Sequence, residues 1–395
     1  MVRIRPFKAL RPKNEYVTRV ASYPYDVVST DEARRILKNN KLSFIGIDKL
    51  ELIKESGIEL KDDEEYKCLA GRLRNLKERN IFIYDCNSMY IYELTYMNQR
   101  QYGLVCTIDL EDYKNGNIKS HEETRVDKEL ERFKHIKYCK AHTGPIYLFQ
   151  KEKAGLREEL VKYASNNIPI YNFTTEDGVT HTLYQIKSQS QIQKLTDAMA
   201  DINSLYIADG HHRLKAASMA TAKLGDRYNE SNYFMGVVFY KDELSVYPYN
   251  RAIRNTMNLS EEDILDSLKD KYIVIPCDKK PEVGLHEFAM YINGRWYKLS
   301  YKMQTQSLDV TLLQDTILSP VFNIADPRWD KNIDFFKAET NAADYLSDNE
   351  LDIAFCLKGL DVDDIIKVSD AKEKLPPKST WFFPKLLSGL LIHPF

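Results

Sequence analysis

Hydrophobic and polar residues change pattern sharply between residues 204 and 224. Leu205 to Ala208 is a short apolar run of the kind that forms a buried β-strand. Leu214 to Leu224 contains four alanines, lacks glycine and proline, and is followed by Gly225, which is typical of a helix and its end. The segment between them, Asp209-Gly210-His211-His212-Arg213 (DGHHR), therefore stands where a strand turns directly into a helix.

Similar patterns predict further elements along the chain. Helices are expected over residues 33–39, 61–79, 125–138, 192–200, 260–268, 308–318 and 362–368. Strands are expected over residues 81–84, 89–95, 102–108, 145–150, 179–184, 233–240, 244–249 and 351–357. The first two strands flank a turn at 85–88 and predict a hairpin, and Asn293-Gly294 predicts a second hairpin over 288–300. The carboxylate-rich segment 109–116 is expected to be a loop.

Around the DGHHR segment the predicted order is strand, helix, strand, motif, helix. This order suits a compact α+β domain, and the predicted fold class is α+β with mixed sheets. Repeats, low-complexity runs and clear linkers are missing from the sequence. We expect an N-terminal α/β region at 1–160, a core with the DGHHR segment at 161–258, and a C-terminal α/β region at 259–395 that packs on the core.

Composition places the chain among globular proteins. Of its 395 residues, 43% are hydrophobic and 29% charged, and the formal net charge of −2 argues against a surface that coats nucleic acid. Its six cysteines are dispersed, which fits reduced thiols better than disulfides or a zinc site. The N-terminus does not resemble a signal peptide, and no run of eighteen apolar residues occurs. We expect a cytoplasmic protein without a membrane or nucleic-acid partner, and the oligomeric state stays open.

The DGHHR segment has the features of an anion site. A strand that ends in Asp-Gly and opens a helix exposes backbone N–H groups at the positive end of the helix dipole. His211, His212 and Arg213 add donors suited to phosphate oxygens. The alternative is an ordinary turn in which Asp209 caps the helix and Arg213 pairs with a carboxylate. Two adjacent histidines among only eight in the chain favour the functional interpretation.

The segment His121-Glu122-Glu123-Thr124 (HEET) supplies a second candidate. It lies just before the helix expected at 125–138, so its Glu122 could be held ionised by the helix dipole and act as a general base. His121 and Thr124 would then contact the substrate. In the alternative interpretation, Thr124 caps the helix and Glu122 is solvated.

Other polar residues are weaker candidates. His181 lies in an alternating strand and either faces the cleft of DGHHR or is a surface residue, the latter being the more common case. Asn250 and Arg251 follow a predicted strand, where the arginine either meets the same phosphates as Arg213 or forms a surface ion pair. The tail around Trp381 is too apolar to be disordered, and its Lys378, Ser379 and Lys385 either close a cleft over an anion or simply dock.

The sequence resembles two known families in these residues. A strand, DGHHR and a helix of small residues resemble the phosphate motif of the ParB/sulfiredoxin superfamily, in the form found in its free-serine kinases. Over the whole length, the segments PFKALRP, YDVVSTDEAR, DLEDYKNG, HEET, DGHHR, PYNR and PPKSTWFFPKLLSGL resemble domain of unknown function family 1015. The first resemblance implies a ParB/sulfiredoxin-like nucleotide-binding core at 161–258, ATP or ADP as donor and free L-serine as acceptor.

The reaction most consistent with these residues is phosphoryl transfer from a nucleotide to a small hydroxyl compound. Asp209, His212 and Glu122 are the predicted catalytic residues, and Asp209 could orient the hydroxyl or hold Mg²⁺ through water. The predicted nucleotide-binding residues are Gly210, His211, His212, Arg213 and Arg251, and the predicted substrate-binding residues are His121, Thr124, His181 and Asn250. Two alternatives stay open: a metal-dependent phosphatase or nucleotide hydrolase with histidine ligands, and a non-catalytic nucleotide-binding regulator. A Walker-type phosphate loop is absent from the sequence.

Overall fold

The computed structural model describes residues 2–54, 63–151, 155–224, 229–327, 329–376 and 378–395. The chain forms two compact units. Unit 1 comprises Met1–Ser120, Thr124–Leu244 and Pro384–Phe395, and unit 2 comprises His121–Glu123 and Ser245–Phe383. The three consecutive regions expected at 1–160, 161–258 and 259–395 do not coincide with these units. Strands from the first region and from residues 161–244 pair in one sheet, and the last twelve residues and the segment 121–123 each join a unit that is distant in sequence.

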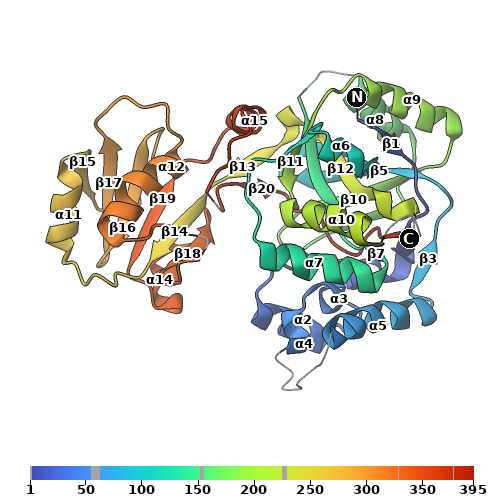
Figure 1. The fold of residues 1–395 in the computed structure, drawn as a ribbon, viewed down its shortest axis with the longest axis horizontal. Coiled ribbons are helices and arrows are strands. Elements are labelled where there is room, and N and C mark those ends of the chain that lie inside the picture. Colours follow the sequence, from blue (N-terminus) through green and yellow to red (C-terminus); the bar gives the residue numbers. More distant parts are fainter. Residues whose placement is uncertain (1, 55–62, 152–154, 225–228, 328, 377) are drawn as a thin grey trace. The chain divides into compact units, whose positions relative to one another are not determined.

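Unit 1 contains a large mixed sheet (Figure 1). In spatial order its strands are β6 (Ile118–Lys119), β11 (Leu205–Asp209), β8 (Ile146–Gln150), β12 (Tyr233–Tyr240), β5 (Gln99–Asp109), β4 (Met89–Tyr96), β10 (Thr180–Ile186) and β9 (Tyr171–Thr174), and β1 (Ile4–Arg5) also pairs with β5. The pairs β6–β11 and β8–β12 are parallel, and the other pairs are antiparallel. Small two-stranded sheets join β2 (Leu10–Pro12) to β3 (Phe82–Tyr84) and β7 (Ala141–His142) to β21 (His393–Pro394).

Helices surround this sheet, and α7 to α10 pack on it through apolar residues. Those of unit 1 are α1 (Val17–Val20), α2 (Thr30–Asn39), α3 (Ile45–Asp48), α4 (Glu51–Lys54), α5 (Glu64–Glu78), α6 (Leu110–Lys114), α7 (Val126–Cys139), α8 (Leu156–Asn166), α9 (Gln189–Ala200) and α10 (His211–Leu224). Alternate strand residues such as Ile91, Leu104 and Leu148 share one core with apolar residues of α7, α8, α9 and α10. Burial of this core is the main force that holds the β11–α10 connection in place.

Unit 2 is built around an antiparallel sheet. In spatial order its strands are β15 (Tyr272–Cys277), β17 (Arg295–Tyr301), β16 (Glu287–Ile292), β19 (Ile353–Leu357), β14 (Tyr249–Ile253) and β18 (Ile333–Lys337). Its helices are α11 (Glu261–Lys269), α12 (Asp309–Leu313), α13 (Ser319–Phe322), α14 (Ala342–Asn349) and α15 (Val362–Asp370), and β13 (Ser245–Tyr247) pairs with β20 (Trp381–Phe383). The expected α+β class with mixed sheets is confirmed by the two units together.

Several local predictions are confirmed. Asn293 and Gly294 have φ angles of 49° and 79°, as a type I′ turn requires, and they connect β16 to β17. Ser260 and Asp263 form a capping box at the start of α11. Phe382 in the apolar tail is 1% exposed.

None of the helices within the described ranges combines the length and apolar character that a membrane crossing needs.

Two predictions about residues 81–116 are wrong. The strands at 81–84 and 89–95 do not form a hairpin, because β3 pairs with β2 while β4 pairs with β5 and β10. The buried Asp85 carboxylate accepts a hydrogen bond from Arg11 Nε at 2.7 Å and so ties the end of β3 toward β2. The segment 109–116 is largely the helix α6, since the Asp109 carboxylate caps it by accepting from the N–H of Glu111 at 2.9 Å.

The strand expected at 244–249 is also divided differently. Pro248 separates β13 from β14, and Asn250 and Arg251 lie inside β14, not after a strand. The helix expected at 61–79 is α5, although residues 61 and 62 lie outside the described residues, as does the predicted helix end at Gly225.

Candidate functional site

The DGHHR segment is where β11 passes into α10, as expected. Asp209 is the last residue of β11, Gly210 makes the turn, and His211 is the first residue of α10. Gly210 has a φ of +100°, which a residue with a side chain rarely adopts, and a Cβ there would lie 3.2 Å from Nε of Arg213. The turn therefore requires glycine both for its backbone conformation and for the approach of the arginine.

Asp209 is held between two cations. Nζ of Lys385 lies 3.0 Å from Oδ2 of Asp209, and Nη2 of Arg213 lies 3.6 Å from the same oxygen. Burial by itself would raise the pKa of Asp209, but Lys385 first and then Arg213 outweigh it and hold that pKa well below the ordinary value. The carboxylate is therefore ionised at neutral pH.

Arg213 is fixed from a second side. Its Nη1 donates to the backbone carbonyl of Pro145, just before β8. A Cβ at Gly144 would lie 3.4 Å from this nitrogen, so the chain passes close to the guanidinium. Burial would lower the pKa of Arg213, but Asp209 raises it above the ordinary value. Arg213 is therefore a permanent, positioned cation at the first turn of α10.

His212 connects α10 to the start of α7. Its Nε2 accepts a hydrogen bond at 3.0 Å from the backbone N–H of Arg125, the residue before α7. A ring nitrogen that accepts from an N–H carries no proton, so a neutral His212 is protonated at Nδ1. Nε2 of His212 is thus occupied, which weighs against the phosphatase alternative in which this histidine binds a metal. His211 is 6% exposed.

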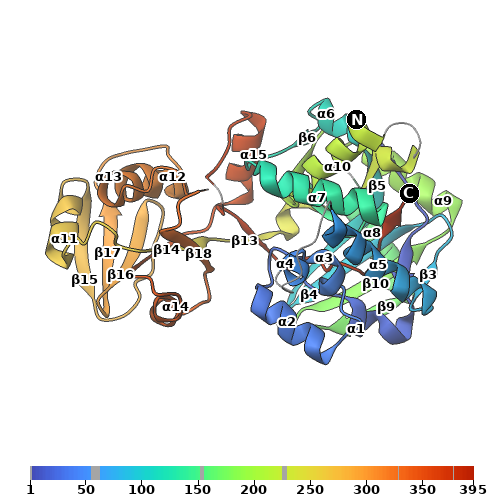
Figure 2. The same ribbon diagram turned by 60° about the horizontal axis from the view of Figure 1, so that its bottom comes forward.

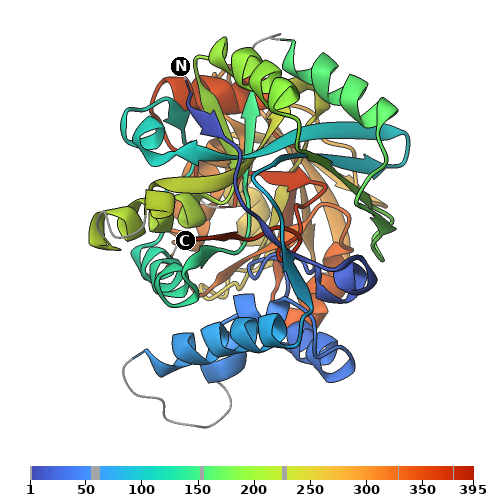
Figure 3. The ribbon, with the colours of Figure 1, turned by 90° about the vertical axis from the view of Figure 1, so that its right-hand side faces the viewer.

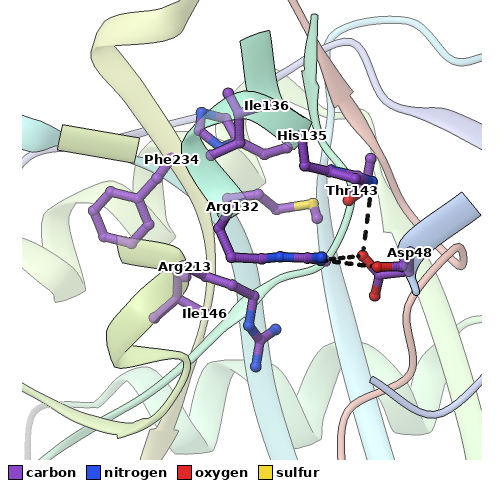
Figure 4. Close-up of a pocket in the computed structure, with 11 residues that line it drawn as sticks. Asp48, Arg132, His135, Ile136, Thr143, Ile146, Arg213 and Phe234 are labelled. Carbon is purple, nitrogen blue, oxygen red and sulfur yellow. Dashed lines mark hydrogen bonds and ion pairs between the residues drawn. The ribbon is translucent and has the colours of Figure 1, made fainter. Parts of the chain in front are cut away.

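A buried polar network lies behind Arg213, and its residues are not among the predicted site residues. A cavity of about 30 Å³, large enough for about one water molecule, is lined by Arg213, Asp48, Arg132 and His135, among others (Figure 4). Nη1 of Arg132 donates to Oδ1 of Asp48 at 3.0 Å, and Oγ of Ser388 donates to Oδ2 of Asp48 at 3.1 Å. The sequence does carry a signal for this network, because Arg132 and His135 have the spacing of residues on the buried face of α7.

The HEET residues divide between the units. Unit 2 contains His121, whose Nε2 lies 3.1 Å from Oγ1 of Thr380, and Glu122, which forms an isolated backbone bridge with Leu375. Unit 1 contains Thr124, whose hydroxyl donates to the Glu129 carboxylate. Thr124 does not cap α7, because Arg125 occupies that position. The capping alternative is therefore wrong, and the role of Glu122 as a base stays a prediction.

His181 is a buried residue of β10. It is 1% exposed on β10, with Nδ1 lying 2.8 Å from the Tyr92 hydroxyl and Nε2 lying 3.2 Å from Oγ1 of Thr175. The surface interpretation is wrong because the ring is buried and both of its nitrogens have partners within the protein. Burial lowers the pKa of His181 to about 4, so the ring is neutral at physiological pH. Its contact with a substrate stays a prediction.

Asn250 and Arg251 are buried in β14 of unit 2. The Arg251 guanidinium donates to the carbonyl of Tyr249 and lies 5.5 Å from the ring centre of Phe335. Burial lowers the pKa of Arg251 to about 10. The surface ion pair considered for Arg251 is therefore wrong, while its contact with phosphate stays a prediction. Nδ2 of Asn250 lies 3.5 Å from the carbonyl of Lys337.

The three polar tail residues have different surroundings. Lys385 belongs to unit 1 and binds Asp209, whereas Lys378 and Ser379 belong to unit 2. Nζ of Lys378 lies 5.2 Å from the ring centre of Tyr249, and Oγ of Ser379 donates to the carbonyl of Pro376 at 2.6 Å. Of these three residues, only Lys385 belongs to the same unit as the DGHHR segment, and it lies beside that segment.

Comparison with known proteins places these residues in a family. The profile of the family described as "Protein of unknown function (DUF1015)" matches residues 4–313, which include the DGHHR and HEET segments. The chain belongs to this family. None of the curated proteins compared with the chain matches it.

Solved structures share a distant resemblance with the chain. A free serine kinase in complex with AMP is 16% identical, with a TM-score of 0.37, and the match covers 72% of this chain and 91% of that one. A conserved hypothetical protein from Pyrococcus furiosus is 15% identical, with a TM-score of 0.36 and coverage of 72% and 93%. SbnI with a C-terminal truncation from Staphylococcus aureus is 10% identical, with a TM-score of 0.39 and coverage of 72% and 85%.

Proposed function

We propose that the chain is a phosphotransferase that moves a phosphoryl group from ATP or ADP to the hydroxyl of a small metabolite, with free L-serine as the first acceptor to test. The observation that carries this proposal is the arrangement of Lys385 and Arg213 around Asp209 at the start of α10. The choice of L-serine rests on the resemblance of the DGHHR segment to the free-serine kinases.

The start of α10 has the physical requirements of a phosphate site. The first N–H groups of a helix lack partners within the helix, and the helix dipole favours negative charge there. Lys385 and Arg213 add two permanent cations, and the ionised Asp209 keeps them in place without movement when charge develops on the phosphoryl oxygens. Such preorganised donors stabilise the transferring group more than the resting phosphate.

The reaction balances without a redox step. The acceptor oxygen forms a bond to the terminal phosphorus, the bond from that phosphorus to the bridging oxygen breaks, and ADP or AMP leaves. The proton of the acceptor hydroxyl goes to a general base, for which we retain Glu122 as the candidate. The low pKa of Asp209 makes this carboxylate a poor base, so we assign it the positioning of the two cations.

The predicted metal role of Asp209 fits the site poorly. Two cations already neutralise its carboxylate, so direct coordination of Mg²⁺ by Asp209 would bring a third positive charge to the same group. Coordination through water stays a prediction.

Phosphorus NMR tests the proposal. The full chain is incubated with MgATP or MgADP, with and without L-serine, and the same is done with Lys385→Met and with Lys215→Met, an exposed lysine of α10. A phosphomonoester that forms only with acceptor, is lost in Lys385→Met and persists in Lys215→Met supports a kinase. The same incubations are repeated with a pool of other small hydroxyl metabolites, and nucleotide binding without turnover for any of these acceptors would reject the kinase and leave the regulator. Release of inorganic phosphate alone would leave the hydrolase.

A further inference from the structure

Unit 1 contains a second cavity, remote in sequence from the DGHHR segment. It has a volume of about 460 Å³. Five of its lining residues lie between residues 37 and 47, from the end of α2 to α3, and six lie between residues 68 and 79, on α5 and directly after it. Figures 2 and 3 show these helices lying together at one side of unit 1. This volume falls in the range of small-molecule sites, about 300–1,000 Å³.

The lining of this cavity is cationic on an apolar base. Among the described residues that line it are Lys41, Arg72 and Arg79, together with the apolar Leu37, Ile47 and Leu76, and none of these lining residues is acidic. A cavity that gathers one sign of charge attracts the opposite charge. Its apolar side chains at the same time suit a hydrocarbon or ring portion of a ligand.

Arg72 is the most informative cation. Its Nη1 donates to the carbonyl of Gly46 at 2.6 Å, which holds the guanidinium at the cavity wall. Arg72 is an exposed residue of α5, and within the described ranges no carboxylate forms an ion pair with it. A bound anion would supply the countercharge that the described residues do not supply.

Gly71 supports an open binding cavity independently of Arg72. It lies in the interior of α5, where glycine weakens a helix relative to alanine. A Cβ at Gly71 would meet no described atom within 4 Å, so close packing does not explain the glycine. By contrast, a Cβ at Gly46 would lie 3.0 Å from Cδ2 of Leu37. The glycine at 71 leaves the cavity open where a larger side chain would fill it.

We propose that this cavity binds a small organic anion, with a phosphate or carboxylate group at Lys41, Arg72 and Arg79 and an apolar portion against Leu37, Ile47 and Leu76. The cavity is a binding site separate from the proposed phosphotransferase site. Its test reads binding at the cavity itself, so it does not depend on catalysis.

Cys68 reports occupancy directly. It is an exposed free thiol that lines the cavity, and the exposed Cys86 lies outside it as an internal reference. The full chain is alkylated with iodoacetamide in the presence of benzylphosphonate, benzoate or the neutral benzyl alcohol, and mass spectrometry follows each cysteine. At roughly ten times the dissociation constant, mass action predicts that Cys68 reacts about tenfold more slowly while Cys86 is unchanged.

Two variants with matched controls decide the outcome. Gly71→Leu fills the open space and Arg72→Gln removes a cation, so both should lose protection of Cys68 by the anions. Gly71→Ala and Arg74→Gln, the latter an exposed α5 residue outside the lining, should keep it. Protection by benzylphosphonate or benzoate but not by benzyl alcohol supports the proposal and names the preferred anion. Equal reactivity of Cys68 with every compound, or equal protection in Gly71→Leu and the parent chain, would overturn it.

Discussion

Lys385 lies 3.0 Å from Asp209, although 176 positions separate the two residues in the chain. The contact brings the C-terminal segment of unit 1 to the start of α10 and places a second cation beside Arg213. The Lys385 side chain is 7% exposed and that of Asp209 20%, so solvent screens their attraction only in part.

Replacement of Lys385 by methionine should destabilise unit 1 and strongly lower turnover. The variant leaves a largely buried carboxylate with Arg213 alone, and removal of one partner of a buried pair costs about 3 kcal/mol. The loss of one positioned donor should lower turnover about 100-fold. Urea unfolding and phosphorus NMR measure the two effects. A Lys385→Met protein with full stability and turnover would contradict the importance of this contact.

Gly210→Ala should disturb Arg213 as well as the backbone. A side chain at a φ of +100° costs about 1–3 kcal/mol, and the added Cβ would crowd Nε of Arg213. Gly178→Ala is the matched control, since its φ is also positive at +80° but a Cβ there meets no described atom within 4 Å. We expect both variants to lose stability in thermal unfolding and only Gly210→Ala to lose nucleotide affinity. Equal nucleotide affinity in the two variants would contradict a phosphate site at this turn.

Glu122→Gln should separate catalysis from binding. The amide keeps the size of the carboxylate but cannot accept the proton of an acceptor hydroxyl, so turnover should fall about 100-fold or more. Nucleotide affinity, measured by calorimetry, should change little. The neighbouring Glu123→Gln serves as the control, and a similar loss of turnover in both variants would reject Glu122 as the specific base.

The stability of the chain should fall as the pH decreases from about 6.5 to 4. Burial, the largest cause, lowers the pKa of His181 to about 4, so in this range the unfolded chain binds a proton that the native chain does not. Each such histidine contributes a slope of at most about 1.4 kcal/mol per pH unit. Burial also lowers the pKa of His135 to about 4 and that of His142 to about 3, which adds to the effect.

His181→Gln tests this assignment. The variant should show a shallower decrease in the free energy of unfolding between pH 6.5 and 4, by about one proton's contribution. Urea unfolding at several pH values measures the slope. An identical slope in the variant and the parent chain would show that His181 titrates alike in the native and unfolded states.

The pairing of the strands is a feature that the local sequence pattern does not predict. The apolar residues at 81–84 and 89–95 predict the two strands, yet β3 pairs with β2, where Asp85 meets Arg11, a residue far from it in sequence. In the same way, the apolar tail was correctly expected to fold, but its division between β20 of unit 2 and the Lys385 segment of unit 1 follows from contacts with distant strands.

The amino-acid sequence by itself determined the elements whose cause is local. The turn from β11 to α10 follows from an apolar run, Gly210 and an alanine-rich helix, and the β16–β17 hairpin follows from Asn293-Gly294. Only the tertiary structure decided that Lys385 meets Asp209, that Arg132 meets Asp48 behind Arg213, and that Gly71 opens a cationic cavity. These contacts join residues whose proximity depends on the burial of a shared core, which no short stretch of sequence encodes.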